Sequence, residues 1–105
     1  MMIATISTTR TEQETTISVR GRFNFEMYAQ FWAAHQKETI GENRSRRFVV
    51  DLADTEYIDS SALGMLLMLR AGADTNEARV EIVNARPEVR MILETANFDR
   101  LFKIT

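Results

Sequence analysis

The 105-residue sequence contains no cysteine, and it has only one histidine, one proline and four glycines. The absence of cysteine excludes disulfides, thiolate metal ligands and cysteine nucleophiles. So few glycines and prolines argue against a disordered or low-complexity chain. The longest apolar run, Ala62 to Leu69, is too short to cross a bilayer, which needs about 20 residues. Because the amino terminus also lacks a basic segment ahead of an apolar core, we expect a cytoplasmic protein without direct membrane insertion.

The chain also lacks a strong excess of one charge. Thirteen basic and fifteen acidic residues leave a net charge of -2, which gives no general attraction for nucleic acid or anionic lipid. We therefore interpret the basic cluster Arg44 to Arg47 as a charged entrance to a strand and expect no nucleic-acid partner. The length and the 45% hydrophobic content predict one domain over residues 1–105.

Alternating apolar and small polar residues predict a β-hairpin from residues 2–9 and 14–21, the second strand closing at Gly21. Asn24 has the character of an N-cap, with Phe23 and Tyr28 placed as a hydrophobic staple around it. A first helix is expected over residues 25–37. Its aromatic-rich face recurs at three- and four-residue spacings, which predicts burial against a sheet; it comprises Phe25, Tyr28, Phe31, Trp32 and His35.

The second half alternates strands and helices. The run 47–52 is typical of a central parallel strand, 62–72 predicts a buried helix ending near Gly72, and 78–85 alternates like a strand. Pro87 suits the start of a third helix, and Asn97 can supply the left-handed turn that ends it. Residues 101–105 suit an edge strand or a docked tail. The resulting order, β-β-α-β-α-β-α-β, predicts a mixed α/β sheet with an N-terminal hairpin and helices packed on it.

The candidate functional residues are two adjacent serines, Ser60 and Ser61, at the start of the second helix. Asp59, Ser60 or Ser61 can cap that helix by accepting a hydrogen bond from its free N–H groups. One cap leaves a hydroxyl spare at a strand-to-helix turn, a favoured functional position in α/β sheets. The helix dipole would stabilise a phosphate there, while the nearby carboxylates of Asp59 and Glu56 oppose it.

Two alternatives based on enzymatic or metal chemistry fit the sequence poorly. A serine hydrolase needs a base, and the single histidine, His35, is expected on the apolar face of the first helix; the G-x-S-x-G and S-x-x-K patterns are also missing. The acidic residues at 51, 54, 56 and 59 lack the glycine and final glutamate of a calcium loop. We interpret them as a solvated loop, and we predict no catalytic residue, metal or cofactor.

The stretch VVDLADTEYIDSSALGMLL resembles the STAS domain, specifically the free-standing bacterial anti-sigma factor antagonists. The hairpin with VRGRFNF, the VVDL strand and the segments VEIVNARPEVRMIL and NFDRLFKI extend the resemblance over nearly the whole chain. The resemblance implies that Ser61 is the phosphorylated residue. It also implies a docking surface for a partner at Asp59, Ser60, Ser61 and Ala62.

The same resemblance implies a binding protein that is not an enzyme. Its partner would be an anti-sigma factor, often itself the serine kinase, and unphosphorylated Ser61 would permit the docking that releases a sigma factor. A PP2C-type phosphatase would restore this form. Ala62 stands where the family often has glycine, and many relatives carry a further terminal helix. The alternative is a STAS scaffold or subunit of a signalling assembly or transport complex without a sigma-factor target.

Overall fold

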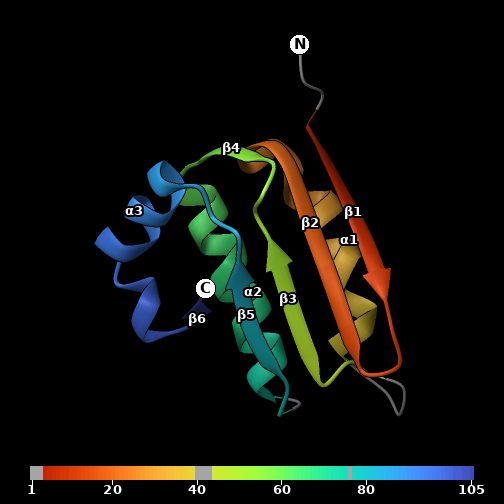
Figure 1. The fold of residues 1–105 in the computed structure, drawn as a ribbon. Coiled ribbons are helices and arrows are strands. Elements are labelled where there is room, and N and C mark those ends of the chain that lie inside the picture. The colour runs from red at the N-terminus through yellow and green to blue at the C-terminus, as the bar shows by residue number, and fades with distance from the viewer. Residues whose placement is uncertain (1–3, 40–43, 76) are drawn as a thin grey trace.

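A six-stranded sheet forms the centre of the protein, seen in a computed structural model that describes residues 4–39, 44–75 and 77–105 (Figure 1). β1 and β2 are antiparallel and form the predicted hairpin, whereas β2, β3, β5 and β6 are parallel neighbours. Five strands lie in the order β1-β2-β3-β5-β6: β1 (Thr5–Arg10), β2 (Glu14–Phe23), β3 (Arg47–Asp51), β5 (Arg79–Val83) and β6 (Lys103–Ile104). The predicted mixed sheet is confirmed, including the parallel strand at its centre and the edge strand near its end.

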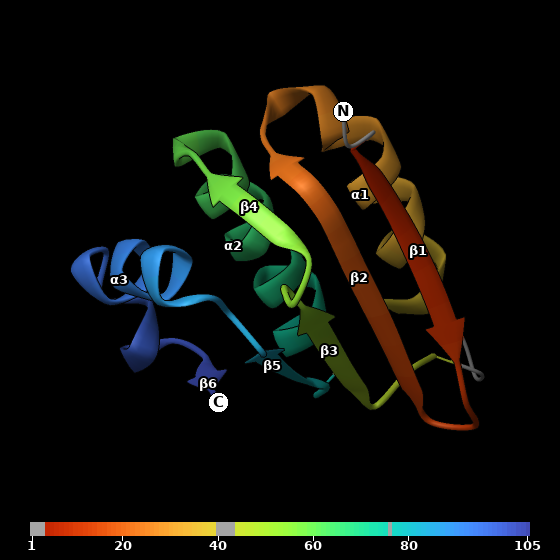
Figure 2. The same cartoon turned by 45° about the horizontal axis from the view of Figure 1, so that its top comes forward.

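The sixth strand, β4 (Thr55–Ile58), corrects the prediction of a solvated acidic loop in this segment. It pairs in parallel with the end of β2, where Phe23 lies opposite Ile58. β2 reaches this second partner by bending at Gly21, which has φ of +90° and a shift in register beside it. Gly21 therefore bends the strand, which continues to Phe23, and does not close it as predicted. Figure 2 shows β2 lying along β3 first and along β4 afterwards.

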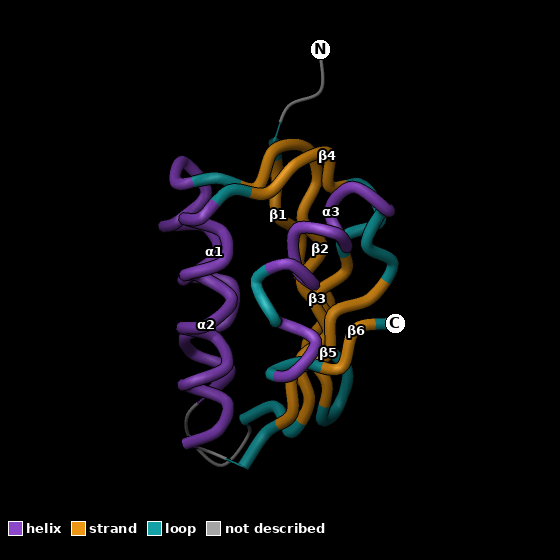
Figure 3. The backbone as a smooth tube through the Cα atoms, turned by 90° about the vertical axis from the view of Figure 1, so that its left-hand side faces the viewer, coloured by secondary structure: helices purple, strands orange, loops and turns teal. Residues whose placement is uncertain are grey.

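Two helices, α1 (Tyr28–His35) and α2 (Ser60–Thr75), lie side by side on one face of the sheet (Figure 3). α2 continues beyond Gly72, where it was predicted to end. The third helix, α3 (Pro87–Thr95), starts at Pro87 as predicted and is followed by Asn97 in the left-handed conformation. Short 3-10 turns, η1 (Phe25–Met27), η2 (Gln36–Thr39) and η3 (Phe98–Arg100), flank α1 and follow α3.

The core fills the space between the sheet and the helices. Its strand residues alternate along the chain, as expected for strands with one face buried, and its α2 residues recur every three or four positions. Fully or nearly fully buried members include Ile17, Val19, Phe48, Val50, Ile82, Met65, Leu66, Leu69, Ala73, Val89 and Leu93. Residues of the same strands that alternate with the core members form the opposite, largely polar face of the sheet.

The prediction for the aromatic face of the first helix is only partly correct. Phe31 and His35 are buried, but Phe25, Tyr28 and Trp32 are exposed. The Asn24 cap is confirmed, since its Oδ1 accepts a hydrogen bond from the N–H of Glu26 at 3.0 Å. For the two residues of the predicted staple the observed ring contacts are others: Phe23 packs against Phe31 with ring centroids 5.2 Å apart, and Tyr28 stacks on Phe25. The helical segment starts with the 3-10 turn η1. Its buried residues, Met27, Phe31 and His35, therefore recur every four positions.

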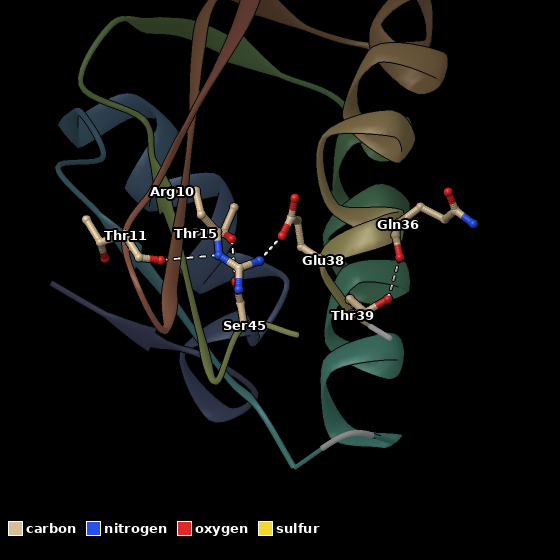
Figure 4. A network of polar contacts seen from close by, with 7 residues as sticks. All are labelled: Arg10, Thr11, Thr15, Gln36, Glu38, Thr39 and Ser45. Atoms are coloured by element: carbon tan, nitrogen blue, oxygen red, sulfur yellow. Dashed lines mark hydrogen bonds and ion pairs between the residues drawn. The ribbon is translucent and has the colours of Figure 1, made fainter. Parts of the chain in front are cut away.

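A polar network fixes the end of the molecule that holds the hairpin turn (Figure 4). Arg10 at the end of β1 forms an ion pair with Glu38 of η2, and the hydroxyl of Thr15 on β2 is hydrogen-bonded to that of Ser45. The N–H of Ser45 also donates to the carbonyl of Glu38. These contacts join the helical layer to the sheet at the end opposite β4, so the two ends of the fold are secured by separate groups.

Candidate functional site

The serine pair lies at the first turn of α2, directly after β4. Parallel pairing of Phe23 with Ile58 holds the end of β4 against β2. The hydroxyl of Thr55 is buried and donates to the carbonyl of Val19 at 2.7 Å, and the N–H of Gly21 donates to the carbonyl of Asp54 at 2.9 Å. The unpredicted strand thus anchors the turn that presents the serines.

Asp59 is the cap of α2. Its Oδ1 accepts a hydrogen bond from the N–H of Ala62 at 3.0 Å, and its carbonyl accepts one from the N–H of Leu63 at 3.2 Å. Within the part of the chain that the structure describes, the hydroxyls of Ser60 and Ser61 make no hydrogen bond. The cap therefore uses neither serine. Both hydroxyls are spare, whereas the sequence predicted one spare hydroxyl.

The four residues predicted to meet a partner differ in accessibility. Ser60 is exposed, while Asp59 and Ser61 are partly buried. Ala62 has 0% exposure, because its methyl group points into the core. The predicted partner contact at Ala62 therefore does not correspond to an accessible side chain. Asp59, Ser60 and Ser61 remain together at the surface of the turn.

The electrostatics of the turn suit an added anion. The N–H groups of Ser60 and Ser61 are the first two of the helix and have no partner within it, because such groups precede the first helical hydrogen bond. They and the helix dipole favour negative charge by up to about 2 kcal/mol. The carboxylate of Asp59 is already engaged in capping but repels a second anion. The turn can therefore carry a phosphate without a large net change in the stability of the domain.

The single histidine is not brought to the serines. His35 ends α1, whereas the serines begin α2, and the two helices start at the same end of the sheet (Figure 3). Its ring packs edge-on against Phe31 and Trp32, with centroids 5.3 and 5.4 Å away. Burial lowers the pKa of His35 from 6.5 to about 4. His35 is therefore not placed to act as a base for either serine.

Two of the acidic residues of the segment 51–59 have separate hydrogen-bonding roles. Asp51 accepts hydrogen bonds from the N–H of Ala53 at 3.0 Å and the amide of Asn84 at 3.2 Å, and Asp59 caps α2. Across residues 4–39, 44–75 and 77–105, no group of three or more histidine or acidic side chains is arranged to hold a metal ion. In the same ranges no helix is long and apolar enough to span a membrane.

Sequence reasoning missed an aromatic neighbour of the turn. Because Phe23 pairs with Ile58 on parallel strands, the next residues, Asn24 and Asp59, leave the sheet side by side. Phe25 follows at the start of η1, and it is 69% exposed. A signal was present in the sequence, since five aromatic or imidazole side chains within residues 25–35 are more than one narrow helix face can bury.

A mixed sheet with two helices on one face and a serine-bearing turn between β4 and α2 places the protein in a class of small α/β domains. The family model described as "Mlab, STAS domain" matches residues 6–104. The STAS-domain containing protein PA14_20770 of Pseudomonas aeruginosa (strain UCBPP-PA14) is 47% identical over 93 residues, which cover 89% of each chain. The chain belongs to the STAS domain family.

Solved structures with the same fold have low sequence identity. A Thermotoga maritima protein described as a candidate anti-sigma factor antagonist aligns with a TM-score of 0.82 and 19% identity, covering 94% of this chain and 84% of that one. The phosphorylated form of the Bacillus cell fate determinant SpoIIAA aligns with a TM-score of 0.76 and 14% identity, covering 96% and 91%. The STAS domain of a Vibrio cholerae SulP transporter aligns with a TM-score of 0.70 and 12% identity, covering 91% of this chain and 75% of that one.

Proposed function

We propose that this protein is an anti-sigma factor antagonist whose binding to an anti-sigma factor is prevented by phosphorylation of Ser61. The observation that carries the proposal is the turn itself, where Asp59 supplies the cap and leaves both serine hydroxyls unengaged. Membership of the STAS family and the likeness to SpoIIAA, a protein with a phosphorylated form, support it. The choice of Ser61 over Ser60 follows the family motif, in which the second serine of the triplet is modified.

The mechanism follows from the difference between a free and a covered surface. In the free domain, the helix dipole and two N–H groups offset the repulsion between a phosphate and Asp59. Against a docked partner, the same phosphate becomes an unpaired charge at an interface, which costs about 2 to 5 kcal/mol. Such a cost weakens affinity by a factor of tens to thousands. Phosphorylation can therefore control docking without unfolding the domain.

The proposed partners are an anti-sigma factor that is also the serine kinase and a PP2C-type phosphatase that removes the phosphate. Docking of the unphosphorylated protein would release a sigma factor. In this role the protein is a cytoplasmic binding module and a regulator of transcription, without an enzymatic activity of its own.

Labelling with radioactive ATP tests the site. Wild-type protein and the matched variants Ser60→Ala and Ser61→Ala are incubated with the anti-sigma factor recovered on immobilised wild-type protein. We expect labelling of wild type and Ser60→Ala but not of Ser61→Ala. Labelling retained in Ser61→Ala and lost in Ser60→Ala would move the site to the more exposed serine.

A second candidate function is a STAS scaffold or subunit of a transport or signalling complex. The likeness to the STAS domain of a SulP transporter favours it, because the same fold serves there outside sigma-factor control. Affinity purification of the tagged protein from its native cells separates the two candidates. Recovery of a membrane transport protein in place of an anti-sigma factor would favour the second.

A further inference from the structure

Most of the large exposed hydrophobic residues belong to the helical layer that contains the serines. Five of the eight large exposed hydrophobic residues in the described part of the chain belong to η1, α1 and α2: Phe25, Tyr28, Trp32, Leu67 and Met68. Single exposed hydrophobic residues are ordinary, but a gathered group indicates a contact with another molecule. The spacing of these residues shows which of them lie near Ser61.

The seam between α1 and α2 can be followed from one point. A Cβ atom at Gly72 of α2 would lie 3.7 Å from Cγ2 of Thr39, in the η2 turn that follows α1. Counting back from Gly72 in steps of three or four residues gives Met68, Met65 and Ser61 as the side of α2 that faces α1.

The same count along the other helix, back from Thr39, gives His35, Trp32 and Tyr28 as the side of α1 that faces α2. Glu38 supports this orientation, since it reaches the other way to Arg10 on β1. The two helices run in the same direction from the same end of the sheet (Figures 1 and 3). Ser61 therefore lies level with Tyr28, and the exposed rings continue from it along the seam.

Four residues form what we call the aromatic strip: Phe25, Tyr28, Trp32 and Met68. The rings of Phe25 and Tyr28 are stacked with centroids 6.0 Å apart, and Trp32 is braced edge-on by His35. Packed aromatic rings lose little conformational entropy when they bind, which makes them effective anchors. The strip is therefore a preformed surface.

The helical stretches that carry Tyr28, Trp32 and Met68 contain no charged residue. Between Glu26 and Lys37 in the first helical segment, and between Asp59 and Arg70 in α2, the sequence contains no lysine, arginine, aspartate or glutamate. A membrane-binding surface would carry basic residues beside the apolar ones. Helical stretches without charge are matched by an uncharged apolar face of a protein.

Gly64 adds an independent observation. It lies inside α2 on the outer side, four residues from both Ser60 and Met68, and a Cβ atom placed there would meet nothing within 4 Å. Its backbone is not in the left-handed region, so the fold does not need a glycine at this position. A glycine weakens a helix. A glycine at this position would let a partner molecule approach the backbone of α2 closely between Ser60 and Met68.

We infer that the aromatic strip, with Gly64 beside it, is the second half of the docking surface and receives an uncharged apolar helix of the anti-sigma factor. This inference rests on the proposed function, because it extends the docking surface proposed at Ser61 along α1 and α2. An amphipathic helix that lays its apolar face on an apolar surface of another protein is a common mode of recognition. Phosphate on Ser61 would then stand beside the strip and the docked helix.

Photo-crosslinking in the native cells tests the inference. Benzoylphenylalanine replaces Ser60 at the switch, Trp32 in the strip, or Ser7, an exposed control on the opposite face of the sheet. We expect the same anti-sigma factor to be crosslinked from positions 60 and 32, and neither adduct to form when Ser61→Asp is added. Position 7 should give no adduct with it.

The outcomes separate this inference from the proposed function. An adduct from position 60 but none from position 32 would overturn the docking strip and leave the switch intact. An adduct from position 32 with a second copy of this chain would also overturn it, since the strip would then serve self-association. Absence of the anti-sigma factor from position 60 would contradict the proposed function itself.

Matched substitutions give a second measurement on purified proteins. Trp32→Gln is compared with Leu101→Gln, because these side chains are 42% and 40% exposed and Leu101 lies away from the strip. With the crosslinked anti-sigma factor as the probe, we expect at least tenfold weaker binding for Trp32→Gln and less than a twofold change for Leu101→Gln. Equal affinities of the two variants, with melting temperatures close to wild type, would overturn the inference.

Discussion

At the scale of single residues, Asp59 is the residue that caps α2 and leaves the two serine hydroxyls unbonded. Its carboxylate satisfies the N–H of Ala62, and its carbonyl receives the first helical hydrogen bond of α2. A side chain that accepts these bonds stabilises a helix, and in doing so it frees the neighbouring hydroxyls for another use. The two serines are thus spare because an acidic residue precedes them.

Asp59→Ala should lower the free energy of unfolding by about 1 kcal/mol, because the N–H of Ala62 loses its partner. Asp59→Asn keeps an oxygen acceptor and should lose much less. Urea denaturation of both variants, with Ser60→Ala and Ser61→Ala alongside, measures these differences. A loss of similar size in either serine variant would show that a hydroxyl shares the capping.

His35 makes the stability of the fold depend on pH. Its Nδ1 is the one side-chain polar atom in the described residues that is buried without a hydrogen-bond partner, and burial lowers its pKa from 6.5 to about 4. Between these two values the unfolded chain binds a proton that the folded chain does not. Stability is therefore expected to fall as the pH drops from 6.5 to about 4, by an amount on the order of 2 kcal/mol.

Chemical unfolding of wild type and His35→Leu at pH 7.5 and pH 4.5 tests this prediction. All other titratable groups are common to the two proteins, so the difference between their stability changes reports on His35. The variant should lose less stability than wild type between the two pH values. An equal loss in both proteins would mean that His35 is protonated in the folded state without cost.

At the scale of elements, sequence periodicity was enough to predict the hairpin, the three helices and most strands. Two errors had nonlocal or subtle causes. β4 is four residues long and contains exposed Glu56 and Tyr57, so nothing local marks it as a strand; its partner is the far end of β2, which the bend at Gly21 brings alongside. A 3-10 turn of three residues set which side of α1 is buried, and no spacing rule indicates such a turn.

Only part of the geometry of the serine turn could be predicted from the sequence, because the rest depends on contacts between distant segments. The turn between strand and helix and its serine pair follow from local pattern, and the structure places Asp59, Ser60 and Ser61 together on that turn. Their roles in phosphorylation and partner binding stay predictions. The burial of Ala62 depends on the phase of α2 against the sheet, and the exposed ring of Phe25 depends on η1. Those features are properties of packing between elements that are distant in sequence.

Two glycines should respond in opposite ways to alanine. Gly64→Ala should raise the free energy of unfolding by about 0.5 to 1 kcal/mol, because Gly64 occupies an ordinary helical position with open space around it. Gly21→Ala should lower it by more than about 1 kcal/mol, because the backbone there has φ of +90° and the added methyl would lie 3.1 Å from Cα of Ala4. Chemical denaturation measures both. A destabilising effect of Gly64→Ala would mean that the fold itself requires this glycine.

At the scale of the whole molecule, the two ends of the fold are held by separate groups. Arg10, Glu38, Thr15 and Ser45 secure the end with the hairpin turn, and the pairing of β4 with β2 secures the end with the serines (Figure 4). A charge added at the serine end therefore meets a local structure that does not depend on the distant network. This separation suits a domain whose surface changes while its core does not.

The melting temperature of Ser61→Asp should accordingly stay within a few degrees of wild type, because a stability change below about 1 kcal/mol moves it by roughly 4 to 8 °C or less in a domain of this size. Differential scanning calorimetry measures this. Ala62→Asp provides the contrast, since it would bury a charge in the core and should unfold the domain or lower its melting temperature strongly. Extensive melting of Ser61→Asp at ambient temperature would contradict a switch that acts only on docking.

The central claim is tested most directly by the affinity of the anti-sigma factor for two forms of this protein, one fully phosphorylated on Ser61 and the other the same preparation after phosphatase treatment. Calorimetric titration at one salt concentration should show tight binding of the dephosphorylated form and binding weaker by a factor of tens to thousands for the phosphorylated form. Equal affinities, or tighter binding of the phosphorylated form, would contradict the account.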